Sequence, residues 1–163
     1  MNGGGNVPKI KIYGLDKLEE HLYMMARETE QAIGKGIYAG ADILADSIKS
    51  SIQSIRTSGP SRWEKKRREK QKQGLLDSFG IAPMQKDKGY YNVKLGFDGY
   101  NDVKSRKHPN GQPNAMIARM YNSGTSVLSK QAFFERGVRS ARNLAKSKAT
   151  EVIEKEIEKL IKE

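Results

Sequence analysis

One short basic segment carries the residue types best suited to binding chemistry. Residues 62–68 read RWEKKRR and contain the chain's only tryptophan. Guanidinium and ammonium groups neutralise phosphates, and an exposed indole ring can stack on a nucleic-acid base. The segment therefore predicts contact with nucleic acid or a protein partner; the alternative is a solvated loop whose tryptophan covers the core edge. The candidate contact residues are Arg62, Trp63, Lys65, Lys66, Arg67 and Arg68.

The net charge of the chain is +11, and its excess is concentrated in two segments. Residues 56–72 carry eight basic and two acidic side chains, and residues 111–148 carry seven and one. A local excess of this size favours a polyanion or an acidic surface as partner, although a solvated face that keeps the protein soluble explains the same charge. No zinc-finger, helix-turn-helix or RNP pattern accompanies it, so we expect no readout of a base sequence.

Catalytic and metal-binding chemistry find little support in the sequence. His21 and His108 do not stand at the spacing of metal ligands, and Asp42 and Asp46 lack a third acid nearby. The chain has no cysteine, which excludes disulfides and thiolate sites. Phosphate-binding glycine loops and the signatures of serine hydrolases and zinc proteases are also missing. We therefore expect no enzymatic activity, no metal and no cofactor.

Hydropathy indicates a small core with solvated extensions. The apolar fraction is 36% and the mean hydropathy is −0.74. The N-terminal sequence lacks the apolar stretch of a secretory signal, and no run approaches about 18 apolar residues. We expect a single domain over residues 1–163 that does not enter a membrane, with a flexible N-terminus at 1–8. The basic segment at about 56–73 is expected to be a loop or arm, with a charged helix as the alternative.

The sequence predicts two long helices as the framework that positions the basic segment. Apolar and small residues recur at spacings of three and four from Leu15 to Ile55, which predicts one long helix. Gly34, Gly36 and Gly40 interrupt this stripe without changing its phase. We interpret these glycines as a close crossing by another helix, and we expect that helix to be the second long one.

The second half of the chain predicts a hairpin and then the second long helix. A strand is expected from about Phe79, a hairpin turn at 86–89, and a polar loop at 98–113. One or two helical turns follow at 114–124, and the long helix begins near Gln131. The predicted class is α+β, a small antiparallel, hairpin-based sheet packed against two long helices.

Three segments together resemble a family of phage structural proteins. They read YGLDKLEEHL (13–22), QGLLDSF (73–79) and IARMYNSGTSVLSKQAFFERGV (117–138). Their order and spacing resemble the small head–tail joining or tail completion proteins of long-tailed phages and prophages. The chain departs from that pattern at Gln73, where the family usually has threonine, and at Ala132, where it often has proline. The tryptophan-containing basic stretch is similar to that of related virion-morphogenesis proteins.

The resemblance implies a structural role rather than a catalytic one. Subunits of such proteins assemble as a ring at the neck or tail end, with other neck or tail proteins as partners. The chain would form a homo-oligomer in the virion, stay monomeric in isolation, and occupy the host cytoplasm during assembly. DNA passes through such rings, which would explain the positive charge of the two basic segments. The alternative function is a basic nucleic-acid-binding accessory protein without sequence-specific readout.

The resemblance also bears on a turn followed by two aromatic residues. Gly124 would allow a tight turn, and the expected subunit-interface residues are Tyr121, Gly124 and Phe133. Adjacent residues on a helix point about 100° apart, so Phe133 and Phe134 cannot share one face. Because Phe134 is in phase with Val138, we expect Phe134 to be buried. Phe133 is expected to be partly exposed and available to a neighbouring subunit.

Overall fold

The computed structural model describes residues 15–162 of the chain, with side chains from residue 17 onward. The predicted α+β class is confirmed: antiparallel hairpin strands pack against two long helices. The predicted flexible segment 1–8 lies outside the described residues. In chain order the elements are α1 (Leu15–Gln53), α2 (Arg62–Ser78), β1 (Phe79–Ile81), β2 (Gln85–Asp87), β3 (Tyr90–Asn92), β4 (Leu95–Phe97), α3 (Asn114–Ser123) and α4 (Phe133–Lys162).

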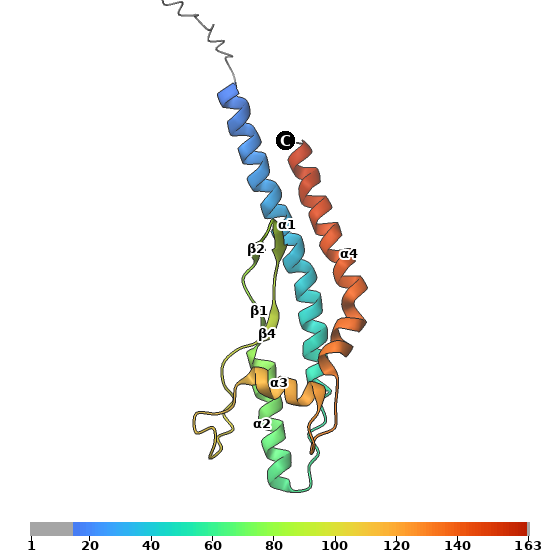
Figure 1. The fold of residues 1–163 in the computed structure, drawn as a ribbon. Helices are drawn as coiled ribbons and strands as arrows, with labels where there is room; N and C mark the ends of the chain where they lie inside the picture. Colours follow the sequence, from blue (N-terminus) through green and yellow to red (C-terminus); the bar gives the residue numbers. More distant parts are fainter. Residues whose placement is uncertain (1–14, 163) are drawn as a thin grey trace, which may run out of the picture.

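Helices α1 and α4 lie side by side and antiparallel, and they form the long axis of the molecule (Figure 1). Glycines set how closely they approach. A Cβ added to Gly36 would lie 2.8 Å from the carbonyl oxygen of Ala149, and one on Gly40 would lie 2.9 Å from that of Ala145. Such distances leave no room for a side chain. The predicted close crossing is confirmed at these two glycines, whereas Gly34 faces the side chain of Met84 instead.

The hairpin runs along α1 (Figure 1). Strand β1 pairs with β4, and β2 pairs with β3, both antiparallel. At the tight turn Lys88 and Gly89 have φ values of 49° and 85°, the left-handed pair that a two-residue hairpin turn requires. The predicted turn at 86–89 is therefore confirmed. Side-chain contacts fasten the hairpin to α1, because Glu30 accepts hydrogen bonds from Lys86 at 2.6 Å and from the Tyr91 hydroxyl.

The core lies at the end of the molecule where α2, α3 and the strands meet the two long helices (Figure 1). Phe79 and Phe97, paired on neighbouring strands, have ring centroids 5.0 Å apart. Phe97 also meets Phe133 edge-on at 6.2 Å. Edge-on and tilted aromatic pairs stabilise a core beyond the area they bury. The largest fully buried side chains are Tyr121, Phe133, Ile48, Ile52, Leu75, Ile117 and Gln71.

The expected roles of the two adjacent phenylalanines are wrong and must be exchanged. Phe133 is fully buried, and Phe134 is only half-buried. The buried face of α4 consists of Phe133, Gly137, Ala141 and Ala145, one residue out of phase with the apolar pattern at its start. The reason is Gly137, whose missing side chain lets the backbone of Ile48 approach. A Cβ there would lie 2.8 Å from the Ile48 Cα.

The basic segment is a helix, a choice that the sequence left open. The Ser61 hydroxyl accepts a hydrogen bond from the Glu64 amide at 3.1 Å, which caps the first turn of α2. Ion pairs at helical spacing follow, Glu64 with Arg68 and Lys65 with Glu69. The helix reaches the core only through its last turns, where Gln71 and Leu75 are buried.

Candidate functional site

Trp63 and Arg67 separate two adjoining hollows between α2 and the loop that follows β4. The hollows measure about 350 Å³ and about 300 Å³, and both residues line each of them. Lys66 and Lys70 complete the α2 side, and loop 102–108 forms the other side. We call this region the basic cleft, defined by Trp63, Lys66, Arg67 and Lys70 with loop 102–108.

The charge of the basic cleft is nearly uncompensated. Its only lining carboxylate is that of Asp102. Among the residues that the structure describes, no carboxylate lies within 4.0 Å of any of the six lining lysine and arginine side chains. A concave surface lined by one sign of charge raises the local concentration of the opposite ion. The lining cations are Lys66, Arg67, Lys70, Lys104, Arg106 and Lys107.

The other predicted contact residues of α2 do not act in this cleft. Lys65 faces Glu69 at 4.0 Å, and Arg68 faces Glu64 at 3.7 Å. Arg68 also donates a hydrogen bond to the carbonyl oxygen of Ser58, so it holds the preceding loop. Arg62 is exposed but lines neither hollow. Of the six predicted residues, the structure therefore brings together Trp63, Lys66 and Arg67.

Trp63 is unusually open to solvent for a tryptophan. Its exposed fraction is 67%, and the guanidinium carbon of Arg67 lies 5.6 Å from the ring centroid, over one face. This cation–π contact orients the indole, most of whose residue surface remains exposed. The sequence alternative, in which Trp63 covers the core edge, is excluded by this exposure.

Buried amides hold the loop of the basic cleft against α2. The Asn101 side chain donates to the backbone carbonyl oxygen of Gln71 at 3.4 Å, and the Gln71 side chain donates to Oε1 of Gln112 at 3.5 Å. The Tyr121 hydroxyl donates to Oε1 of Gln71 at 3.1 Å. Burial raises the pKa of Tyr121 to about 12, so the hydroxyl stays protonated at neutral pH. The loop is thus fastened through polar groups within the core.

Gly74 is required for this attachment. A Cβ at this position would lie 2.3 Å from the Asn101 side-chain nitrogen. Gly111 is required as well, because its φ is +91° and a Cβ there would lie 1.8 Å from the Asn101 carbonyl oxygen. The two glycines therefore let the polar loop approach α2 closely enough to complete the cleft.

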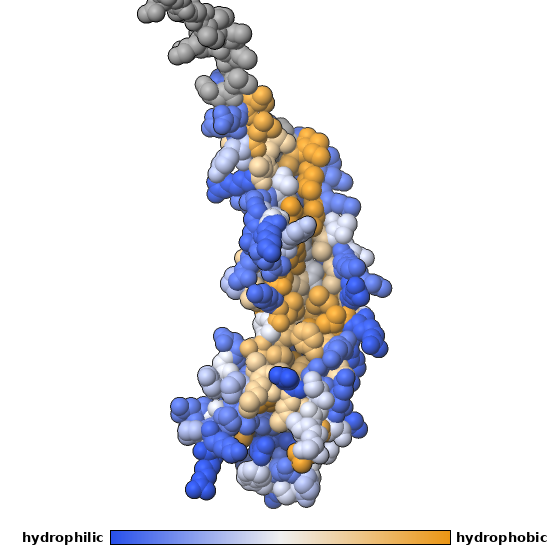
Figure 2. Space-filling view, in the orientation of Figure 1, coloured by the Kyte–Doolittle hydropathy of each residue, from blue (hydrophilic) through white to orange (hydrophobic). Residues whose placement is uncertain are grey.

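A second surface lies at the opposite end of the molecule, at the N-terminal end of α1 and the C-terminal end of α4 (Figure 1). Large apolar side chains there are exposed, with exposed fractions of 51% for Leu18, 57% for Leu22 and 75% for Ile161. Figure 2 shows apolar side chains gathered on both helices at this end. We call this surface the apolar tip, defined by Leu18, Leu22, Met25, Ile157, Leu160 and Ile161.

One ion-pair cluster joins the two helices below the apolar tip. Glu156 on α4 accepts hydrogen bonds from Lys159 on the same helix and from Lys35 on α1. The hydrogen bond from Lys159, followed by that from Lys35, lowers the pKa of Glu156 to about 2. The carboxylate therefore stays charged throughout the range in which most proteins fold.

The residues that flank the turn between α3 and α4 are buried, although the turn itself is exposed at Ser123 and over 125–127. Tyr121 and Phe133 have no exposed area, and neither offers surface to a second subunit. Gly124 has a φ of +82°, and a Cβ there would lie 2.8 Å from the Lys130 amide nitrogen. The Asn122 side chain accepts a hydrogen bond from the Phe134 amide at 3.0 Å, at the start of α4. The predicted tight turn is confirmed, and it positions α4.

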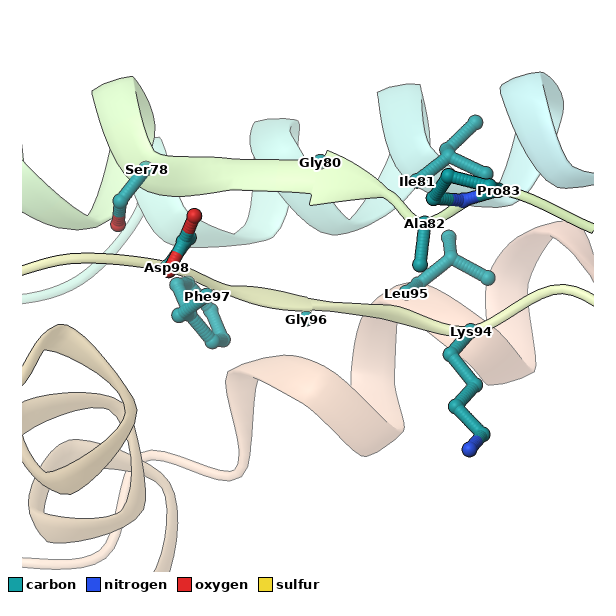
Figure 3. Close-up of a pocket in the computed structure, with 10 residues that line it drawn as sticks. All are labelled: Ser78, Gly80, Ile81, Ala82, Pro83, Lys94, Leu95, Gly96, Phe97 and Asp98. Carbon is teal, nitrogen blue, oxygen red and sulfur yellow. The ribbon is translucent and has the colours of Figure 1, made fainter.

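A further hollow, of about 470 Å³, lies over strands β1 and β4. Figure 3 shows why it exists: Gly80 and Gly96 face each other across the paired strands and carry no side chains. Lys94 and Asp98 flank β4 and lie toward opposite ends of the hollow. The remaining lining is mostly apolar.

Metal-binding groups and membrane-spanning helices can be assessed only for the residues that the structure describes. Within residues 15–162, no group of three or more histidine, cysteine or acidic side chains is placed to hold a metal ion. None of the described helices combines the length and hydropathy needed to span a bilayer. Comparison with models of known families, with curated proteins and with solved structures finds no match to this chain.

Sequence reasoning missed half of the basic cleft. Lys104, Arg106 and Lys107 belong to a loop of modest net charge, more than 40 residues after Trp63 in the sequence. Only the fold places them beside α2. The one available signal was local, because the five residues 103–107 contain three cations and no acid.

Proposed function

We propose that the chain is a structural assembly subunit that acts at the head–tail junction or tail end of a long-tailed phage. The observation that carries the proposal is the apolar tip. Exposed side chains of this size on two neighbouring helices mark a protein–protein contact, because a monomeric surface rarely gathers them without use. The resemblance of the three segments to tail completion proteins supports the place of assembly.

The partner proposed for the apolar tip is a neighbouring copy of the chain. Each long helix buries the middle of its apolar stripe against the other helix and leaves the end of the stripe exposed at the tip. A copy that supplies similar helices would bury both, as neighbouring helices do in a bundle. The resemblance, which implies a ring of identical subunits, supports the same occupant.

The composition of purified particles tests this proposal. The phage or prophage that encodes the chain should be propagated with and without the gene, and its particles analysed by mass spectrometry and electron microscopy. We expect the chain in intact particles, and heads and tails that fail to join when the gene is deleted. Normal infectious particles from the deletion strain would exclude the role.

Two substitutions on α1 test the apolar tip itself. Leu22→Glu should abolish incorporation into particles, because it places a charge in the contact. The matched control Gln31→Glu adds the same charge at an exposed polar position of the same helix and should assemble normally. Both should fold, since exposed substitutions usually change stability by less than about 0.5 kcal/mol. Equal assembly of both variants would exclude the tip as the contact.

A second candidate function, binding of nucleic acid without sequence readout, is favoured by the basic cleft. Six cations face two hollows with one carboxylate among them. The two functions use opposite ends of the molecule and are compatible in one protein. Loss of binding to all nucleic acids, single- and double-stranded, would remove this second candidate and leave the first intact.

A further inference from the structure

We propose that the basic cleft binds single-stranded nucleic acid, with phosphates in the two hollows and an unpaired base stacked on Trp63. The inference rests on the second candidate function and narrows it to a class of ligand. It draws on the position of Trp63, the distribution of ion pairs on α2, and the way the loop is held.

Trp63 stands where a stacking platform is needed. It lines both hollows, so a strand that places successive phosphates in them passes directly over the indole ring. Arg67 lies over one face of the ring, and 67% of the residue is exposed, so an unpaired base can reach the indole. Stacking on an aromatic ring stabilises binding of any base, because every base has a flat face.

The duplex form hides those flat faces between neighbouring base pairs. A duplex could meet the lysine and arginine side chains through its phosphates, but it could not stack on Trp63 without unpairing. An acidic peptide has the charge but lacks a flat ring of the same kind. The exposed indole at the centre of the cleft therefore favours an unpaired strand over both.

The ion pairs of α2 separate binding cations from structural ones. Lys65 and Arg68 face Glu69 and Glu64, on the side away from the cleft. Lys66 and Arg67 face the hollows, and no carboxylate lies within 4.0 Å of either. Phosphates would thus meet cations that need not first release a partner, which favours binding and counterion release.

The loop side of the cleft is held in place before a ligand arrives. Asn101, at the start of the loop, is almost fully buried, and its backbone amide donates to the Gln112 carbonyl oxygen at 2.8 Å. Lys104 and Arg106 therefore lie a few residues after Asn101, which is held within the core. A binding surface that is already ordered loses less conformational entropy on association.

Fluorescence measures the proposed stacking directly, because Trp63 is the chain's only tryptophan. The intact protein should be titrated with labelled oligothymidylate and oligouridylate of about 10 nucleotides, a length within the range of known single-strand sites. We expect anisotropy to report binding, with quenching of the tryptophan emission at the same concentrations. The two oligonucleotides distinguish DNA from RNA as the preferred strand.

Three variants divide the binding into its parts. Trp63→Ala should weaken binding by roughly 10-fold or more, and Trp63→Phe should restore part of it. Lys66→Glu should weaken binding and reduce its salt dependence. Lys65→Glu is the matched control, because it reverses the adjacent charge, which lies outside the cleft. The affinity of this variant should be closer to that of the wild type. Circular dichroism should show the same helix content in all of them.

Three outcomes overturn the inference, and they differ from one another. If a duplex of the same length binds as tightly and Trp63→Ala has no effect, the cleft recognises phosphates only, and nucleic-acid binding survives without the stacking. If neither single strands nor duplex bind while polyglutamate does, both the inference and the second candidate function fail. Equal weakening by Lys65→Glu and Lys66→Glu would likewise exclude the cleft as the specific surface.

Discussion

The two ends of the α1/α4 pair use the same helical spacing for opposite purposes. From Gly36 to Ile48, small residues on both helices let the two backbones come into contact, which leaves no space for larger side chains at the glycines. At the apolar tip, large residues such as Leu22 and Ile161 continue the pattern but remain exposed. Small residues thus line the contact made within the protomer, and the large exposed residues of the apolar tip form the surface that we propose a second copy covers.

The largest expected difference between the two ends comes from removing one large side chain at each. Phe133→Ala should destabilise the protein by about 3–5 kcal/mol, because it empties a fully buried position against Phe97. Leu22→Ala at the apolar tip should change stability by less than about 0.5 kcal/mol. Denaturant unfolding measures both values. Similar losses from the two variants would show that the tip is folded into the protomer.

The neighbouring Phe134→Ala is the internal control for this prediction. Phe134 is half-buried and follows Phe133 directly, so its truncation should cost clearly less. A larger loss from Phe134→Ala than from Phe133→Ala would reverse the assignment of the buried ring.

Close contact between the helices is tested by two glycines only two residues apart. Gly36→Ala should destabilise by about 1–3 kcal/mol, because the new Cβ meets the Ala149 carbonyl oxygen at 2.8 Å and must separate the helices. Gly34→Ala should be neutral or stabilising by up to about 1 kcal/mol, since it gains helix propensity. Its Cβ meets only the mobile end of Met84, at 3.2 Å. Thermal melts of the two variants should therefore shift in opposite directions or by clearly different amounts.

A smaller effect is expected where the buried amides hold the basic cleft. Tyr121→Phe removes the hydroxyl that donates to Gln71 and should cost about 1 kcal/mol, with the ring still packed in the core. Hydrogen exchange should show faster opening in loop 102–108, while exchange along the α1/α4 crossing stays unchanged. Equal acceleration in both places would mean that the loop is not separately fastened.

The smallest predicted effect depends on pH and concerns the ion-pair cluster below the apolar tip. Because the pKa of Glu156 is lowered in the folded protein, its charge contributes stability above the ordinary value of 4.5. That contribution is lost as the pH falls toward about 2. The melting temperatures of wild type and Glu156→Gln should therefore differ most above pH 4.5 and converge in acid. A constant difference across this range would exclude Glu156 as the titrating group.

The sequence by itself determined the order and nature of most elements. The spacing of apolar residues predicted both long helices, and the glycines in the first predicted their close crossing, because helical periodicity is a local property. The turn at Lys88 and Gly89 was equally readable, since few residues adopt left-handed φ values. The basic segment with Trp63 was found from composition alone.

Only the tertiary structure decided which face of α4 is buried at its start and which distant segments form the basic cleft. The buried ring of the aromatic pair is Phe133, because the backbone of Ile48 occupies the space that a side chain at Gly137 would fill. The basic cleft likewise forms only because Asn101 can approach α2 at Gly74. This approach brings Arg67 and Arg106, which are 106 − 67 = 39 positions apart, to the same cleft. Such contacts depend on how closely a second segment of backbone approaches. The pattern of hydropathy and charge along the sequence does not specify that separation.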